Sequence, residues 1–237
     1  MGENTFDPVW ENLYRNPSYR SWYPWSSVVS FVLGMAPEDR PRAEISILEI
    51  GCGSGNNVWF VAREGFKAAG VDASESAIEF AQERFRSEGL TADLRVADFT
   101  KLPFEEDSFD MVFDRGALYC TPRSGVVSCI SEVRRVLKPG GLFQCTPWSD
   151  RHSSFYRSPD PDGAVRDIKV GSIVSGSQMS FFSLQDIREL FKDGWVFLKL
   201  NHVEETEMIR PERLQHCEWL IVVRKVGDGR VKAPLQE

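Results

Sequence analysis

The 237-residue chain has only three histidines and five cysteines, and no two cysteines form a Cys-x-x-Cys pair. A histidine and a cysteine are adjacent only at His216-Cys217. Structural zinc sites need four such ligands at short spacings, and disulfide frameworks need cysteines in pairs. We therefore expect no metal site, and we expect the cysteines to be buried, reduced thiols.

Long apolar runs are also missing, since no stretch approaches the 20 or so consecutive apolar residues that cross a bilayer. The N-terminus, Met-Gly-Glu-Asn-Thr-Phe-Asp, lacks a basic region followed by an apolar core, so no signal peptide is predicted. The sequence thus predicts a soluble, cytoplasmic protein without a membrane partner.

There is no excess of positive charge, because 28 Lys and Arg are set against 35 Asp and Glu, a net charge of −7. Contacts with phosphate groups supply most of the affinity of nucleic-acid-binding proteins. A local basic patch would be compatible with this balance, but the overall charge disfavours a nucleic-acid partner.

What the sequence does contain is a regular alternation of strand and helix patterns. Short apolar runs predict strands at residues 45–50, 66–71, 94–97, 109–113 and 142–146. Apolar residues at helical spacing predict helices at residues 57–63, 74–89 and 126–137. This alternation predicts a parallel sheet with helices on both faces, which binds its ligand where the strands end. A later helix at 183–191 and strands at 196–203 and 219–225 predict a hairpin at the sheet edge.

A glycine loop, Gly51-Cys-Gly53-Ser-Gly55, follows the first predicted strand and precedes a helix. Glycines there permit positive φ and close approach of a ligand to the backbone. Asp72 ends the second strand, where its carboxylate could accept both hydrogens of a ribose diol. A dinucleotide fingerprint requires glycine at position 56, which is asparagine, and no phosphate-binding G-x-x-x-x-G-K-[ST] loop is present. The loop therefore predicts a nucleoside ligand without a pyrophosphate.

These motifs resemble those of the class I S-adenosylmethionine-dependent methyltransferases. The likeness covers Leu-Glu-Ile-Gly-Cys-Gly-Ser-Gly, Gly-Val-Asp-Ala-Ser, Ala-Asp-Phe with Leu-Pro-Phe-Glu-Glu-Asp-Ser-Phe-Asp, Asp-Arg-Gly-Ala-Leu-Tyr and Leu-Lys-Pro-Gly-Gly-Leu, in order over residues 45–146. The resemblance implies an α/β fold with a Rossmann-like, doubly wound seven-stranded sheet, mostly parallel with the last strand antiparallel. We expect a single domain over residues 1–237. Its expected parts are an N-terminal helical lid at 1–40, a cofactor-binding core at 41–146, a substrate-side insertion after strand 5 at 147–182, and a C-terminal helix and strands at 183–237.

The resemblance also implies S-adenosylmethionine as cofactor, with S-adenosylhomocysteine as product, and assigns residues to it. Gly51, Gly53, Gly55 and Ser74 belong to the two matching loops. Glu49 would lie near the methionine amine, and Asp114 and Arg115 would line the methionine side. Asp72 would hold the ribose, with Ala73 against the adenine. Asp98 would take the adenine amino group, beside Phe99.

For the methyl acceptor, the motifs are less specific. The Asp/Asn-Pro-Pro-Tyr/Phe tetrad of amino-methylating nucleic-acid enzymes and the Pro-Cys pair of cytosine carbon-5 enzymes are both absent. We expect a small-molecule acceptor, methylated at a hydroxyl or amine, and a monomer or homodimer. A metabolite, a natural product or a saccharide-like compound would each suit. A protein or RNA methyltransferase, or a non-catalytic scaffold that binds the cofactor, remains the alternative.

Candidate lid and substrate residues come from the aromatic N-terminus, from the end of the fourth strand and from the insertion. They are Tyr14, Arg20, Trp22, Tyr23, Tyr119, Tyr156, Arg157 and Arg166. His202, near the last strands, is the candidate general base, since a histidine titrates near neutrality.

Overall fold

Residues 46–50, which the sequence predicts as a strand, form an inner strand of a mixed sheet, between β2 and β4. We describe the fold from a computed structural model, which places residues 5–155, 163–166, 168, 177–209, 211 and 213–227. The strands are β1 (Ser46–Ile50), β2 (Lys67–Asp72), β3 (Asp93–Val96), β4 (Phe109–Asp114), β5 (Leu137–Cys145), β6 (Trp148–Ser149), β7 (Phe181–Phe182), β8 (Trp195–Thr206) and β9 (Gln215–Lys225). The α-helices are α1 (Val9–Tyr14), α2 (Ser26–Met35), α3 (Asn56–Arg63), α4 (Glu75–Ser87), α5 (Arg123–Val136) and α6 (Leu184–Leu190). Short 3-10 turns, η1 to η3, lie at Pro17–Tyr19, Arg42–Glu44 and Leu118–Cys120.

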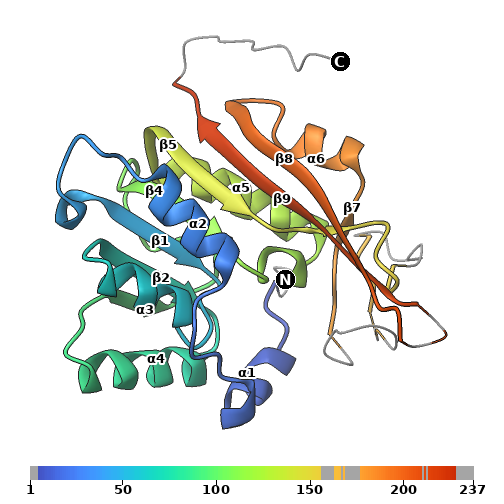
Figure 1. The fold of residues 1–237 in the computed structure, drawn as a ribbon, viewed down its shortest axis with the longest axis horizontal. Helices are drawn as coiled ribbons and strands as arrows, with labels where there is room; N and C mark the ends of the chain where they lie inside the picture. The colour runs from blue at the N-terminus through green and yellow to red at the C-terminus, as the bar shows by residue number, and fades with distance from the viewer. Residues whose placement is uncertain are drawn as a thin grey trace.

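The sheet has the order β3-β2-β1-β4-β5-β9-β6-β7, with β8 paired on the other part of β9 (Figure 1). Strands β1 to β5 are parallel to one another, whereas β9 is antiparallel to β5, β6 and β8. The doubly wound α/β fold with an antiparallel last strand is therefore confirmed. The described residues form two strands beyond the seven expected, β6 and β7. Each has only two residues, which is too short to give a periodic pattern in the sequence.

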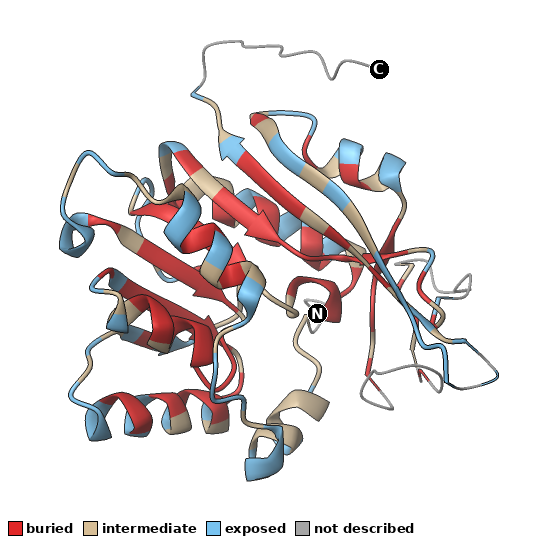
Figure 2. Ribbon diagram, in the orientation of Figure 1, coloured by how far each residue is buried: buried red, intermediate tan, exposed pale blue. Residues whose placement is uncertain are grey.

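Each face of the sheet carries its own apolar core, because strands that are buried on both faces must be covered on both. One core joins residues of α2, α3 and α4, such as Val28, Val58 and Phe85, to the sheet. The other joins residues of α5 and α6, such as Val126 and Ile187. Figure 2 shows the central strands buried along their length between these layers. The five cysteines are free and buried, as expected.

Three strands are longer than their sequence patterns indicate. β5 begins at Leu137 because this residue already pairs with Phe109, on the far side of a register shift in the β4–β5 ladder. β8 and β9 extend to Thr206 and Gln215, so their hairpin projects beyond the rest of the sheet (Figure 1). None of the helices in the described part of the chain is long and apolar enough to cross a bilayer.

The N-terminal segment docks against the carboxyl edge of the parallel strands through α1. Glu11 of α1 accepts hydrogen bonds from the hydroxyls of Ser74 and Ser76, each at 2.6 Å. These serines cap and open helix α4, so a carboxylate lies where the backbone N–H groups favour negative charge. The hydrogen bonds lower the pKa of Glu11 to about 2. Helix α1 is thereby held beside the strand ends that bear the candidate site.

Candidate functional site

The glycine loop connects β1 to α3 with a backbone that only glycine adopts easily. Gly51, Gly53 and Gly55 have φ of 63°, 50° and 74°. A Cβ on Gly53 would lie 2.3 Å from the Tyr14 hydroxyl, and one on Gly51 would lie 2.1 Å from Cβ of Ala117. Gly51 and Gly53 are therefore required both by their positive φ and by the short distance to the neighbouring side chains.

Asp72 ends β2 directly beside this loop. Its carboxylate accepts hydrogen bonds from the backbone N–H of Gly53 at 2.8 Å and of Ser74 at 2.9 Å. Burial raises the pKa of Asp72, and these two hydrogen bonds partly oppose that effect. The carboxylate is thus fixed in orientation, with the loop on one side and the start of α4 on the other.

A cavity of about 620 Å³, open to solvent, lies between these strand ends and the N-terminal segment. The walls come from the strand ends and from the first residues of the chain: Thr5, Phe6, Asp7, Trp10, Tyr14, Gly51, Asp72, Ala73, Asp98, Phe99, Arg115, Gly116, Ala117 and Cys120.

Seven residues singled out from the sequence line this cavity, namely Tyr14, Gly51, Asp72, Ala73, Asp98, Phe99 and Arg115. Four others lie behind the wall and shape it. Gly53 and Gly55 form the loop, Ser74 caps α4 through the Ala77 N–H, and Asp114 accepts from the backbone N–H groups of Ala117 and Leu118. Strand ends far apart in the sequence therefore converge on one site.

Two buried carboxylates beneath the cavity wall have an unused oxygen. Oε1 of Glu49 accepts a hydrogen bond from the Asn57 side chain at 2.7 Å, but Oε2 has no partner among the described residues. Oδ2 of Asp114 is likewise without a partner in that part of the chain. Burial raises the pKa of both groups. A cationic ligand nearby would offset this cost, as the ammonium and sulfonium groups of S-adenosylmethionine would.

Asp98 is already engaged on the adenine side of the cavity that the family resemblance implies. It accepts hydrogen bonds from the backbone N–H of Thr100 at 2.8 Å and from the Thr100 hydroxyl at 2.7 Å. The Thr5 hydroxyl donates to its other oxygen. The N-terminal segment therefore competes for the carboxylate that the sequence assigns to the adenine amino group.

Other lid and substrate candidates lie away from the cavity. The Arg20 guanidinium lies over the Phe80 ring of α4 at 4.5 Å, and Trp22 packs edge-on against the same ring. Tyr23 is 80% exposed. Arg20 and Trp22 thus fasten the segment to α4, and neither they nor Tyr23 are among the cavity-lining residues that the lid hypothesis expects.

The remaining candidates fall on η3 and on the expected insertion. Tyr119 is buried and stacks on Trp148, with ring centroids 4.5 Å apart. Arg166 donates to Gln178 and is not among the lining residues. Tyr156 and Arg157 lie outside the described residues.

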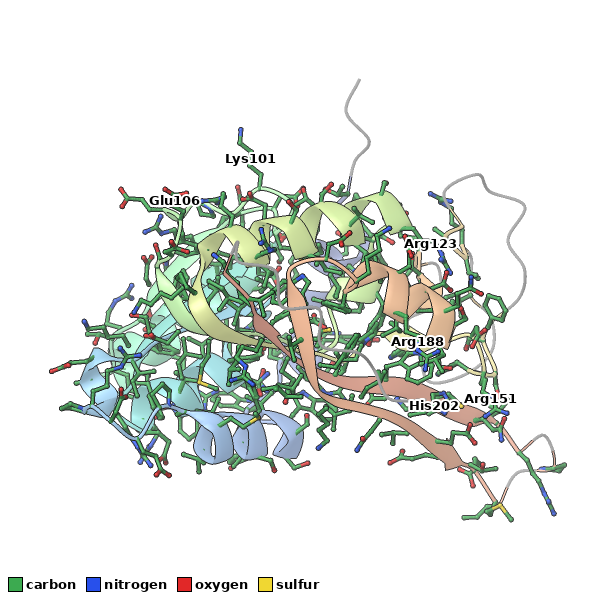
Figure 3. The ribbon with its side chains drawn as sticks, turned by 90° about the horizontal axis from the view of Figure 1, so that it is seen from above. Lys101, Glu106, Arg123, Arg151, Arg188 and His202 are labelled. Atoms are coloured by element: carbon green, nitrogen blue, oxygen red, sulfur yellow. The ribbon has the colours of Figure 1, made fainter. Side chains whose placement is uncertain are left out.

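His202 does not line the cavity, contrary to its expected role as general base. Its Nε2 lies 2.7 Å from the hydroxyl of the buried Ser149, and its Nδ1 lies 3.1 Å from Glu204. Figure 3 shows His202 beside Arg151 at the β8–β9 hairpin, where Arg151 also pairs with Glu204. Both ring nitrogens are thus engaged, one with Ser149 of β6 and the other with Glu204 of β8 itself.

The sequence reasoning missed Thr5, Phe6 and Asp7, which form one wall. Nothing in their spacing distinguishes them, although the aromatic density of the N-terminus was a signal that this region covers something. Gly116 and Ala117 were also missed, and the Asp-Arg-Gly-Ala motif that contains them could have indicated them. Asp7 accepts a hydrogen bond from the backbone N–H of Gln178 at 3.0 Å, which joins this wall to the insertion.

Comparison with known proteins agrees with this geometry. Residues 47–141 match the family model described as a methyltransferase domain. A probable phthiotriol/phenolphthiotriol dimycocerosates methyltransferase of Mycobacterium ulcerans is 38% identical over 99 residues, which are 41% of this chain and 37% of that protein. The chain thus spans well under half the length of this relative.

Two solved structures share the fold over most of this chain. One, from a study of the conversion of a disulfide bond into a thioacetal group during echinomycin biosynthesis, has a TM-score of 0.68 at 22% identity, covering 92% of each chain. The other is a 1,6-didemethyltoxoflavin-N1-methyltransferase of Burkholderia thailandensis with bound S-adenosylhomocysteine, with a TM-score of 0.61 at 16% identity, covering 85% of this chain and 77% of that one. The motifs, the cavity and these likenesses together support a class I S-adenosylmethionine-dependent methyltransferase, with the family match confined to residues 47–141.

Proposed function

We propose that this protein transfers a methyl group from S-adenosylmethionine to a hydroxyl or amine of a small-molecule acceptor. The observation that carries the proposal is the fixed Asp72 carboxylate at the cavity wall, with two buried, unpartnered carboxylate oxygens beneath that wall. This arrangement suits a ribose diol beside a cationic amino-acid end. The neighbours that act on a mycobacterial lipid and on a toxoflavin precursor support an acceptor of low molecular mass.

When bound, the cofactor supplies an electrophilic methyl group on a sulfonium. The chain's own residues bind and orient, since the displacement needs alignment and exclusion of water more than a dedicated acid or base. Asp72 and the glycine loop would hold the nucleoside, and Ala73 and Phe99 would flank the base. Trp10 and Tyr14 of the N-terminal segment would exclude water from the reacting groups.

Methyl transfer to a hydroxyl or amine also requires that the acceptor lose a proton. The bond from sulfur to the methyl carbon breaks and a bond from oxygen or nitrogen to that carbon forms, so the sulfonium becomes a neutral thioether. The acceptor gives up one proton to a base or to water. No histidine is among the lining residues, so the described wall leaves this step to a carboxylate or to solvent.

A screen with a radiolabelled methyl donor tests the proposal. Acceptors would be pooled by class, with phenols, aliphatic alcohols, amines, sterols, bulk protein and transfer RNA in separate pools. Label in a small-molecule pool and release of S-adenosylhomocysteine are expected. Label only in protein or RNA would instead favour the alternative macromolecular substrate, and cofactor binding without any transfer would favour a scaffold.

A further inference from the structure

A line of hydrogen bonds runs through the aromatic core beside β9 and reaches the cavity wall. We call Ser154, His152, His216 and Glu218 the histidine relay. The backbone N–H of Ser154 lies 3.0 Å from Nδ1 of His152, whose Nε2 lies 3.2 Å from Nδ1 of His216. Nε2 of His216 in turn lies 3.4 Å from Oε2 of Glu218. The same Glu218 oxygen lies 3.3 Å from Nη1 of Arg115.

The direction of every hydrogen bond in the relay follows from its first member. A backbone N–H can only donate, so Nδ1 of His152 must be the bare nitrogen of a neutral ring. Its proton is then on Nε2, which donates to Nδ1 of His216. The proton of His216 is therefore on its own Nε2 and is directed at Glu218. Both rings are neutral in this arrangement, and burial lowers the pKa of His152 to about 4, consistent with that state.

Packing holds the relay in place. The His152 ring stacks on Trp148 with centroids 4.3 Å apart and planes 6° apart, and His216 meets the same indole edge-on. His216 and Glu218 are two residues apart on β9, so their side chains share one face of the strand. Neither ring can turn without disturbing this stack.

Arg115 is the cavity end of the relay. Its guanidinium is held from three sides, by Glu218, by the Thr146 hydroxyl at 3.3 Å and by the Trp25 ring at 4.4 Å. Nε is buried and has no hydrogen-bond partner among the described residues. Arg115 is one of the lining residues, so it brings a fixed positive charge to the cavity wall, with Nε buried just behind it.

We propose that Arg115 binds a carboxylate in the cavity, and that Glu218, His216 and His152 are positioning residues that fix its guanidinium for this role. A carboxylate matches the planar, doubly donating edge of a guanidinium. The inference rests on the proposed function, because the carboxylate belongs either to the amino-acid end of the cofactor or to the methyl acceptor. The following experiments distinguish these two sources.

The tautomers can be measured without any ligand. Long-range ¹H–¹⁵N correlation spectra of the imidazole nitrogens report which nitrogen carries the proton, and the chain has only three histidines to assign. We expect Nε2–H tautomers for both His152 and His216 at pH 7. A proton on Nδ1 of either ring would overturn the relay.

Binding of S-adenosylhomocysteine and of 5′-methylthioadenosine, which lacks the amino-acid end, tests the cofactor as source of the carboxylate. Arg115→Gln should then weaken S-adenosylhomocysteine about tenfold or more and leave 5′-methylthioadenosine unchanged. Arg115→Lys keeps the positive charge but lacks the planar guanidinium. Its affinity for S-adenosylhomocysteine should therefore lie between those of wild type and Arg115→Gln. Arg151→Gln removes another arginine that pairs with a glutamate, on the exposed hairpin, and should change neither affinity.

Benzoate, titrated into the complex with S-adenosylhomocysteine, tests the acceptor as source. Here wild type should bind benzoate, Arg115→Gln should not, and both nucleoside affinities should be the same in the two proteins. If Arg115→Gln changes neither the S-adenosylhomocysteine affinity nor benzoate binding, the carboxylate role is wrong. If wild type binds neither nucleoside, the proposed function is wrong and so is the carboxylate role of Arg115. The histidine relay is still tested in that case, by the tautomers measured in the ¹H–¹⁵N spectra.

A matched pair of variants tests positioning. The glutamine of His216→Gln can accept from His152 and donate to Glu218, whereas the leucine of His216→Leu can do neither. Arg115→Gln lowers the affinity either for S-adenosylhomocysteine or for benzoate. That affinity should be retained in His216→Gln and should be several-fold lower in His216→Leu. Equal affinities in the two variants would contradict a positioning role.

Discussion

The backbone N–H of Gly53 and the carboxylate of Asp72 lie 2.8 Å apart, which ties the glycine loop to the end of the second strand. Because of this contact, one residue both shapes the loop and faces the cavity. Asp72→Asn keeps the shape of the side chain and removes its charge. We predict that it weakens S-adenosylhomocysteine binding by about 1.5–3 kcal/mol, the range for a hydrogen bond to a charged group. Calorimetric titration measures this loss.

The control for this variant is Asp93→Asn, on the exposed edge strand β3. It should leave the affinity unchanged. An unaltered dissociation constant in folded Asp72→Asn protein would contradict the ribose assignment.

A side chain at position 53 would overlap the Tyr14 hydroxyl, so substitutions at these two positions should affect stability jointly. We predict that Gly53→Ala lowers the free energy of unfolding by about 2–4 kcal/mol, from strained backbone and overlap with the Tyr14 hydroxyl. In a Tyr14→Ala background the overlap is gone, so the cost should fall to about 1–2 kcal/mol. Urea unfolding of the four proteins gives the coupling energy. Equal costs in both backgrounds would show that α1 is not docked on the loop.

Glu11 makes the docking of α1 sensitive to acid. Its pKa is about 2 when docked and 4.5 ordinarily, so the contribution to docking is complete above pH 4.5 and is lost as the pH falls toward 2. Glu11→Gln should cost about 1–2 kcal/mol at pH 7, less than a fully buried charged pair because the side chain is 22% exposed. The difference in stability between wild type and variant should shrink from pH 5 to pH 3, measured by thermal unfolding. A constant difference across that range would rule out this anchor.

The two parts of the N-terminal segment should differ in mobility. Arg15 is exposed at the end of α1, whereas Arg20 is held over Phe80 and donates to the Tyr14 carbonyl. We predict that trypsin cleaves after Arg15 in the free protein, that S-adenosylhomocysteine protects this bond, and that cleavage after Arg20 is slow in both states. Mass spectrometry of timed digests identifies the sites. Identical cleavage with and without ligand would mean that α1 does not act as a lid.

The parts of the site that were predictable from sequence are those encoded locally. Gly51 and Asp72 follow apolar runs whose length and order already indicate a parallel sheet, so their meeting at one edge follows from topology. The role of Arg20 was not predictable, because an aromatic, basic segment reads the same whether it covers a cavity or packs on a helix. The Arg115–Glu218 pair joins residues 103 positions apart, and no local pattern indicates such a contact. His202 was chosen for its titration range alone, and its contacts with Ser149 and Glu204 depend on strand pairing.

The most direct test of the account is a calorimetric and thermal-shift titration of the wild-type chain with S-adenosylhomocysteine, with NAD as the matched nucleotide. The account predicts one binding site for S-adenosylhomocysteine per chain and a rise in melting temperature that grows with ligand concentration. NAD should give neither effect, because Asn56 stands where the dinucleotide-binding fingerprint has its third glycine. Binding of NAD with no response to S-adenosylhomocysteine would contradict the account.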